Sequence, residues 1–459
     1  MKRIALMVLA GVLLLSAVEW DIEQVTKGTK HYSYQPLLAL DDQGYAHVLF
    51  AQWNDDVHLK VASNVIGSWV IKEVALVTEG PSYCLDVDSE GNTFVAFSQW
   101  LDETNWDLFI ATDTNGKFVS VNITKDEIVN VVPIITLDHE GIPHLLYVEL
   151  TVPEEVAELF YGYDDAEGFH SEQVCENLHP DYYIGFDLVF DQLHIPHAFY
   201  IGDDNHLWHT TSGEPGWIGD QLNELSSEYP SAVADASGAF HVAYDVGSNS
   251  IHYITNQSGA WQDELVSAGG DPKGWNEQPS IAIDPNGDPH VVWLRVNADY
   301  WHDFYYANKT TGVWVEEPIT STPEEDEWPG YGHYFAIDAH GYGHLVYCAD
   351  DEDRVTQIYY AKSTEPLTGS AIAEQPNEVN PFDLAIREST IHFSLPYASL
   401  IRLDLYDACG RLVTHLASDA YPAGDHTIPI NSAGLAAGVY FVHLESTNQQ
   451  ASAKLVLTH

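Results

Sequence analysis

Six histidines each follow an aspartate by six residues, inside a repeated turn segment of the form Asp-x-x-Gly-x-x-His or a close variant. Imidazole and carboxylate groups are metal ligands and acid–base catalysts, so the recurrence first suggests chemistry. Equivalent positions in a ring of repeats point in different directions and lie too far apart to share one ion at about 2 Å. We therefore expect each pair to tie a turn to its strand or one repeat to the next. The pairs are Asp41 and His47, Asp138 and His144, Asp191 and His197, Asp235 and His241, Asp284 and His290, and Asp338 and His344.

The same segments count the repeats of the chain. A further copy, Asp88 to Phe94, keeps the frame without histidine, and the seven copies lie 44 to 54 residues apart. Short runs rich in β-branched and aromatic residues flank each copy, and repeats of this length are typical of propeller blades. The last repeat lacks a fourth strand, whereas residues 20–26 carry the pattern of one. We predict an all-β fold, a seven-bladed β-propeller whose last blade is closed by this N-terminal strand, followed by an Ig-like β-sandwich.

The repeated turn resembles the Asp-box of sialidase-like (BNR-type) propellers, in which the motif reads Ser-x-Asp-x-Gly-x-x-Trp. The match is partial, because the copies here read Asp-x-x-Gly-x-x-His. Sialidases hold the substrate carboxylate with several arginines, whose planar forks suit carboxylates. The predicted propeller contains two arginines, Arg295 and Arg354. The resemblance therefore implies the fold, and sialidase activity is not expected.

Long loops with aromatic and acidic residues are expected on the propeller face opposite the Asp-x-x-Gly turns. Loops on a rigid scaffold concentrate binding residues, and flat rings among carboxylates and amides suit neutral sugars. The alternative, in which these aromatic residues pack between blades, stays open. The candidate ligand-binding residues are Trp100, Trp106, Tyr182, Trp275, Trp301 and Trp328.

A second set of side chains could perform acid–base catalysis. The loops of the sixth and seventh repeats carry His302, Tyr331 and His333, together with Arg295 and Arg354. Such a set could abstract a proton beside a sugar carboxylate, as in polysaccharide lyases, provided that the groups converge within hydrogen-bond reach. A carboxylate-pair glycosidase is a further enzymatic alternative.

The chain is strongly acidic. Its 69 acidic and 17 basic residues give a formal net charge of −52. This field repels nucleic acid and acidic polymers and attracts cations. We expect no required cofactor. Binding of Ca²⁺ at Asp350, Asp351 and Asp353 stays open as an alternative, although these residues lack EF-hand spacing. The four cysteines show no zinc-ligand spacing, and we expect buried free thiols, with one long-range disulfide as the alternative.

Both ends of the chain carry export signals. A basic start followed by an apolar run predicts a secretory signal peptide over residues 1–17. The predicted propeller spans residues 18–363, and a linker rich in Pro, Gly, Ser and Glu spans 364–380. Residues 381–459 contain the segments YDACGRLV, PAGDH and GLAAGVYF. They closely resemble the type A C-terminal sorting domain of type IX secretion substrates. The resemblance implies the type IX machinery as a partner, and secretion or display at the outer cell surface.

Two classes of function follow from the sequence. The first is an exported propeller that binds a glycan or a protein without catalysis, with no nucleic-acid partner and no membrane span after signal cleavage. The alternative is an extracellular polysaccharide-degrading enzyme, a lyase or glycosidase, that uses the loops of blades six and seven. The two classes differ in whether His302, His333 or Tyr331 meets Arg295 or Arg354 in one cleft.

Overall fold

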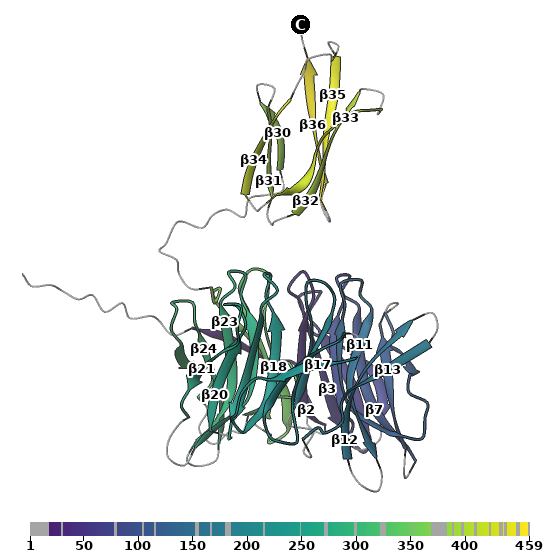
Figure 1. Cartoon of the computed structure of the whole chain (residues 1–459), viewed down its shortest axis with the longest axis vertical. Coiled ribbons are helices and arrows are strands. Elements are labelled where there is room, and N and C mark those ends of the chain that lie inside the picture. Colours follow the sequence, from purple (N-terminus) through teal and green to yellow (C-terminus); the bar gives the residue numbers. More distant parts are fainter. Residues whose placement is uncertain are drawn as a thin grey trace, which may run out of the picture. The chain divides into compact units, whose positions relative to one another are not determined.

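The computed structural model of the 459-residue chain describes residues 18–28, 31–77, 80–102, 105–113, 116–151, 156–165, 168–179, 185–213, 216–247, 249–269, 274–297, 301–321, 327–351, 353–368, 383–387, 390–395, 399–407, 411–421, 424–430, 435, 438–446 and 450–457. These residues form strands and loops only, and none of them belongs to a helix that could cross a membrane. The chain divides into two compact units, Met1–Gly369 and Ser370–His459 (Figure 1). The predicted signal peptide lies outside the described residues.

Antiparallel four-stranded meanders build the first unit. The first is β2 (Tyr32–Leu40), β3 (Ala46–Trp53), β4 (Val57–Ser63) and β5 (Val70–Val77). The second is β6 (Tyr83–Val87), β7 (Thr93–Asp102), β8 (Asn105–Thr112) and β9 (Val119–Asn122). The third is β10 (Val129–Leu137), β11 (Pro143–Thr151), β12 (Val156–Asp165) and β13 (Gly168–Cys175). A single parallel pair between Val129 and Trp106 joins the second and third meanders into one eight-stranded sheet.

Three further meanders follow in the chain. They are β14 (Phe186–Phe190), β15 (Pro196–Ile201), β16 (Leu207–Thr211) and β17 (Ile218–Gln221); β18 (Ser227–Ala234), β19 (Phe240–Val246), β20 (Ser250–Thr255) and β21 (Gln262–Ser267); and β22 (Trp275–Ile283), β23 (Pro289–Val296), β24 (His302–Asn308) and β25 (Val315–Pro318). Period-two alternation of apolar residues, with turn residues between the runs, is the pattern that predicts such strands.

The last sheet of this unit combines both ends of its chain. It contains β26 (Glu327–Trp328), β27 (Phe335–Ile337), β28 (Gly343–Asp350), β29 (Thr356–Ser363) and β1 (Trp20–Gln24). Strand β1 pairs antiparallel with β29, from Trp20 opposite Ser363 to Gln24 opposite Tyr359. The N-terminal segment therefore supplies the outer strand that the last repeat lacks, as the sequence predicted.

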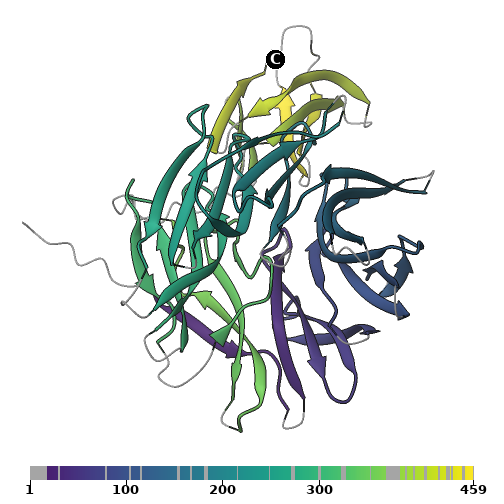
Figure 2. The same ribbon diagram turned by 60° about the horizontal axis from the view of Figure 1, so that its bottom comes forward.

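The sheets follow one another around a ring (Figure 2). The first strands of neighbouring sheets contact in the order β2, β6, β10, β14, β18, β22 and β27, and β2 in turn contacts β27 and β28. The arrangement is propeller-like. The ring of sheets closes by packing between neighbouring sheets, and the strands within each sheet are hydrogen-bonded to one another.

The Asp-x-x-Gly turns join the first and second strands of the sheets. In the first copy, Oδ1 of Asp41 accepts hydrogen bonds from the backbone N–H of Gln43 at 3.0 Å and of Tyr45 at 2.9 Å. Gly44 has a φ of 77°, in the left-handed region that glycine adopts without strain. The aspartate thus closes its own turn through its side chain.

The repeated histidines link these turns to the strands and to the neighbouring sheet. Nε2 of each lies 3.2 to 3.6 Å from Oδ2 of the aspartate in its own turn. In four sheets Nδ1 lies 2.5 to 2.6 Å from a third-strand tyrosine hydroxyl, and a tryptophan of the next sheet packs edge-on against that tyrosine. The tyrosine–tryptophan pairs are Tyr161 and Trp217, Tyr253 and Trp314, Tyr306 and Trp20, and Tyr360 and Trp69.

These Asp–His–Tyr chains have the electrostatics of structural ties. Burial lowers the pKa of His144, His241 and His344 in spite of the adjacent aspartates. Burial also raises the pKa of Tyr161 and Tyr253, so both hydroxyls keep their protons. A neutral imidazole between a carboxylate and a protonated phenol satisfies buried polar groups and activates no nucleophile.

Bulges in the first strands shape the centre of the ring. Gln35, Val132, Tyr229 and Gln278 each precede a proline and have φ values of 49° to 53°. The pairing register of the four strands shifts at these points. Residues other than glycine seldom adopt this backbone conformation. For the β-branched Val132 it is an outlier.

The second unit consists of two antiparallel sheets with a shared core. One contains β30 (Asp383–Arg387), β31 (Thr390–Leu395) and β34 (Gly424–Pro429), and the other β33 (Leu412–Tyr421), β32 (Ser399–Asp407), β35 (Gly438–Ser446) and β36 (Gln450–Leu457). Ile391 and Phe393 of the first sheet pack with Leu403, Leu405 and Val442 of the second.

Candidate ligand-binding site

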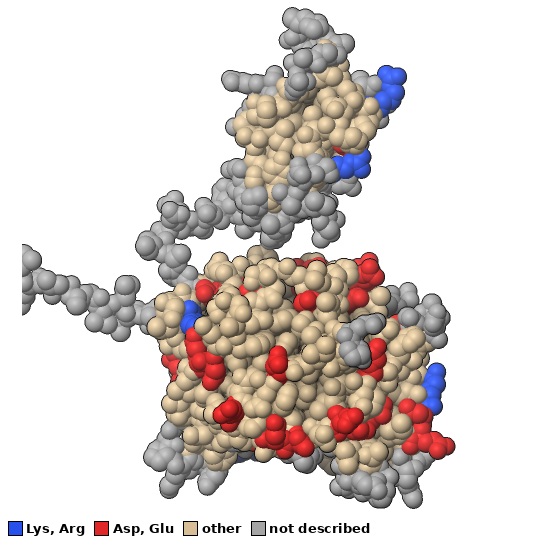
Figure 3. Space-filling view, viewed as in Figure 1, with Lys and Arg blue, Asp and Glu red and all other residues tan. Residues whose placement is uncertain are grey.

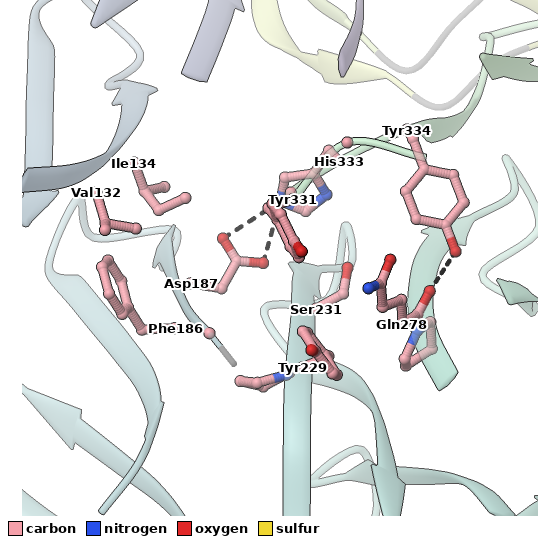
Figure 4. A pocket seen from close by; sticks show the side chains of 15 residues that line it. Val132, Ile134, Phe186, Asp187, Tyr229, Ser231, Gln278, Tyr331, His333 and Tyr334 are labelled. Carbon is pink, nitrogen blue, oxygen red and sulfur yellow. Dashed lines mark hydrogen bonds and ion pairs between the residues drawn. The ribbon is translucent and has the colours of Figure 1, made fainter. Parts of the chain in front are cut away.

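A pocket of about 60 Å³ lies where the first strands of several sheets of the ring converge (Figure 4). It forms where the bulges at Val132, Tyr229 and Gln278 interrupt the first strands β10, β18 and β22. A water molecule needs roughly 10–15 Å³ by this measure, so the pocket can hold several waters or part of a small ligand. Its lining consists of Val132, Ile134, Gly185, Phe186, Asp187, Tyr229, Pro230, Ser231, Gln278, Pro279, Gly330, Tyr331, Gly332, His333 and Tyr334.

An ion pair crosses this pocket. Nε2 of His333 lies 3.0 Å from Oδ2 and 3.2 Å from Oδ1 of Asp187. Both aspartate oxygens also accept backbone N–H groups, from Leu188 at 2.9 Å and from Ala232 at 2.7 Å. The carbonyl of His333 accepts the N–H of Leu38 at 2.8 Å. Both partners are therefore held in place by neighbouring strands, and the pair joins the last sheet to the sheet of β14.

The charges of the pocket are coupled. Burial opposes a charge on the ring of His333, but the attraction and hydrogen bond of Asp187 outweigh it and raise the pKa of His333. Enclosure raises the pKa of nearby Asp86 to about 6, although backbone N–H groups and His333 stabilise its charge. His333 therefore holds its proton more readily than a free histidine, and one of its ring nitrogens is committed to Asp187. Its Nδ1 has no hydrogen-bond partner among the residues that the structure describes.

Aromatic and acidic side chains form a second cluster, which we call the rim: Trp275, Glu277, His302 and Trp328. The rings of His302 and Trp328 lie 3.8 Å apart between centroids, and Nε1 of Trp275 donates to Oε2 of Glu277 at 2.9 Å. Nε2 of His302 lies 4.0 Å from Oε1 of Glu277. Burial raises the pKa of Glu277, against the stabilising effects of Trp275 and His302.

The rim adjoins the central pocket. Glu277 precedes Gln278, which lines the pocket, and the charges of Tyr331 and Glu277 both raise the pKa of Tyr229 after the larger effect of burial. Tyr331 and Trp328 are 48% and 38% exposed, so a ligand can reach both residues. The rim and the pocket therefore share the strand β22 and lie close enough to interact electrostatically.

The two predicted arginines lie away from this pocket, and neither lines it. Arg295 donates to Asn276 at 2.8 Å, to Ser267 at 2.8 Å and to Glu316 at 2.6 Å. Arg354 occupies the left-handed position of a turn, at a φ of 62°, and its N–H bonds to the carbonyl of Asp351. The structure brings His333 and Tyr331 together in the pocket, and His302 with Trp328 in the rim.

The other predicted ligand-binding residues are dispersed. Trp100 and Trp106 oppose each other on β7 and β8, and Trp100 is 44% exposed. Trp301 is half-buried, and its backbone N–H donates to Oδ1 of Asn297 at 3.1 Å. Tyr182 lies outside the described residues.

The acidic residues predicted as calcium candidates accept hydrogen bonds within a turn. Oδ1 of Asp351 accepts the N–H groups of Asp353 and Val355, and Oδ1 of Asp350 accepts the hydroxyl of Thr356. In the part of the chain that the structure describes, no three His, Cys, Asp or Glu side chains are grouped to hold a metal ion. Cys84, Cys175 and Cys348 are free thiols.

Sequence reasoning missed Asp187, Asp86, Tyr229 and Gln278. One signal was present, the recurrence of proline after Gln35, Val132, Tyr229 and Gln278 at matching places in four repeats. A recurring proline inside a strand pattern indicates a bulge, and bulges are frequent next to binding sites.

Residues 385–458 match the family model of the secretion system C-terminal sorting domain. The tail is a secretion sorting domain. It directs the chain through the type IX system to the cell surface or the extracellular space. The match begins at Ala385, two residues after the start of β30, so the sorting domain corresponds to the second compact unit.

Solved structures similar to the chain are related only distantly. A protein of unknown function from Dyadobacter fermentans is 9% identical, with a TM-score of 0.43, over 74% of this chain and 97% of that chain. The Aleuria aurantia lectin is 10% identical, with a TM-score of 0.40, over 63% and 97%. The leech intramolecular trans-sialidase is 12% identical, with a TM-score of 0.38, over 76% and 70%. No curated protein matches the chain.

Proposed function

We propose that the chain is an exported glycan-binding protein. In this proposal residues 18–363 form a seven-bladed β-propeller, residues 364–380 a linker and residues 381–459 an Ig-like sorting domain, behind a signal peptide over 1–17. The propeller binds neutral sugars through the rim and the surface around it. The sorting domain delivers it to the outside of the cell.

The geometry of the rim carries this proposal. Trp328 packs on His302 and remains 38% exposed, which leaves a flat ring facing solvent. Glu277 lies within reach of His302 and of the Trp275 N–H, which orient its carboxylate. A flat apolar ring beside oriented acceptors matches a sugar, which has an apolar face and hydroxyl edges.

Charge limits the class of sugar. Asp and Glu are scattered over the visible face of the first unit, and Lys and Arg are few (Figure 3). With a formal net charge of −52, the protein repels uronates, sulfated glycans and nucleic acid. Neutral glycans meet no such barrier.

The positions of the two arginines favour a binding function over the lyase alternative. A lyase needs a cation at the substrate carboxylate beside the base, and Arg295 is engaged by Asn276, Ser267 and Glu316. Arg354 belongs to the turn that Asp351 closes. Neither supplies that cation to Tyr331 and His333.

A glycan array probed with the purified first unit and sorting domain together tests the proposal. We expect binding to at least one neutral oligosaccharide and weaker binding to uronate-containing chains. Trp328→Ala should weaken this binding at least tenfold, since it removes the stacking surface. The matched control is Trp53→Ala, because Trp53 is 50% exposed and lies outside the rim. Failure to bind any neutral glycan, or equal effects of the two variants, would refute the proposal.

A further inference from the structure

Five residues with positive φ line the central pocket, three within first strands and two in the segments that lead into β14 and β27. Three are the pre-proline residues Val132, Tyr229 and Gln278, and two are Gly185 at 110° and Gly332 at 136°. Glycine would adopt all five conformations without strain, yet three positions carry large side chains. Strained backbone of this kind concentrates at ligand sites, where the surrounding structure holds it.

The two glycines keep room that a side chain would fill. A Cβ atom on Gly185 would lie 3.2 Å from Cδ of Pro230, and one on Gly332 would lie 3.2 Å from Cδ2 of Leu37. Both contacts are tighter than ordinary packing. The pocket is therefore bounded by backbone at these points and by side chains at the other three.

The ion pair of His333 and Asp187 lies in the wall of this small pocket, whose volume is about 60 Å³. His333 comes from the last sheet and Asp187 from β14, and they meet within the pocket (Figure 4). The strands β10, β14, β18 and β22 surround the pocket on the sides. A pocket of about 60 Å³ can take the end of a chain but not a segment that continues in both directions.

The pocket offers one apolar wall and one polar wall. Val132, Ile134 and Phe186 form the apolar side. Opposite them lie the side chain of Gln278 and the ring of His333, whose Nδ1 has no hydrogen-bond partner among the described residues. A sugar ring has the same division, with an apolar face and hydroxyl groups on its edge.

We propose that this central pocket is a subsite for the terminal unit of a neutral glycan, whose adjoining units lie on the rim. The inference rests on the proposed glycan binding and adds that the protein recognises chain ends. Tyr331 stands between pocket and rim and covers the terminal ring. The strongly negative charge of the protein disfavours a terminal uronate. Asp187 acts as a positioning residue, because it holds His333 with Nδ1 turned to the ligand.

The test uses the full chain and the neutral oligosaccharides that bind on the array, immobilised through their reducing ends. We expect the methyl glycoside of the terminal unit to compete for binding, and the methyl glycoside of an internal unit of a different sugar not to compete. Extension of the chain end by a uronic acid should abolish binding.

Gln278→Gly separates a binding role from a structural one. Glycine relieves the left-handed backbone at a φ of 53° and removes the side chain, so we expect a thermal midpoint within about 3 °C of the parent and affinity at least tenfold lower. Tyr331→Ala should behave in the same way, because Tyr331 is 48% exposed. Neither substitution changes a residue of the hydrophobic core, so both variants are expected to fold and the binding measurement can be interpreted.

Two results would overturn the inference in different ways. If Gln278→Gly and Tyr331→Ala bind like the parent while Trp328→Ala loses binding, the end-recognising pocket is wrong and glycan binding on the rim stands. If no neutral oligosaccharide binds the parent protein, glycan binding itself is wrong and the pocket subsite falls with it.

Discussion

Nε2 of His333 lies 3.0 Å from Oδ2 of Asp187, although the two residues are 146 positions apart in the chain. The contact joins the last sheet to the sheet of β14 across the interior of the ring. It places an imidazole and a carboxylate where the first strands converge, beside the strained residues that line the pocket.

Asp187→Asn should lower the pKa of His333. The carboxylate raises this pKa against the opposing effect of burial, and an amide supplies no charge. In the parent, the stability gained from protonated His333 is present below the unfolded pKa of about 6.5 and is lost as pH rises through the higher folded pKa. Histidine-resolved NMR titration of the full chain measures the shift. Asp351→Asn is the control, and an unchanged His333 pKa in Asp187→Asn would contradict the assignment.

His209→Tyr should make the protein more resistant to acid. Nε2 of His209 lies 2.8 Å from Nδ1 of His197, at the place where four other sheets have tyrosine. Burial, followed by repulsion from His197, lowers the pKa of His209 from 6.5 to about 4. The unfolded chain therefore binds the extra proton first, and stability falls between pH 6.5 and 4, by an amount on the order of 3 kcal/mol.

Urea unfolding at pH 7 and pH 5 measures this effect. We expect the free energy of unfolding of His209→Tyr to fall less between the two pH values than that of the parent. The same pH dependence in both proteins would show that His209 is not the acid-sensitive group.

Tyr253→Phe should destabilise the first unit by about 1 to 2 kcal/mol. The substitution keeps the ring against Trp314 but removes the hydroxyl that meets Nδ1 of His241, and so leaves a buried imidazole nitrogen without a partner. Tyr45→Phe, at a 37% exposed position, is the control and should be nearly neutral. Chemical denaturation decides the point, and equal effects at both positions would argue against the Asp–His–Tyr tie.

Trp20→Ala should weaken closure of the ring. Trp20 begins β1 and packs edge-on against Tyr306 of the neighbouring sheet, with ring centroids 6.2 Å apart. Loss of this packing should cost about 2 to 4 kcal/mol and expose β29 to hydrogen exchange. Trp53→Ala, at a 50% exposed position, should leave both properties unchanged. Protection of β29 that survives Trp20→Ala would show that β1 closes the sheet without this contact.

Local patterns in the sequence determined the strands, their turns and the place of the N-terminal strand. Asp41, Gly44 and Tyr45 show why, since the aspartate bonds the backbone of its own turn and glycine takes the left-handed position. The sorting domain could also be recognised from the sequence, because the motifs that identify it are short contiguous segments. Such features depend on residues a few positions apart, so the order of residues suffices to reveal them.

Only the tertiary structure decided which side chains share a site. Sequence grouped His333 with Arg295 and Arg354, because their repeats are adjacent, but its partner is Asp187 of a distant repeat. Ring closure brings each first strand against the first strands of its two neighbours, and so residues far apart along the chain come together. The left-handed bulges at Val132, Tyr229 and Gln278 then set which side chains line the pocket. The spacing of residues along the sequence reveals neither the contact between distant residues nor the direction in which a bulge points its side chain. Both depend on how the sheets pack around one centre.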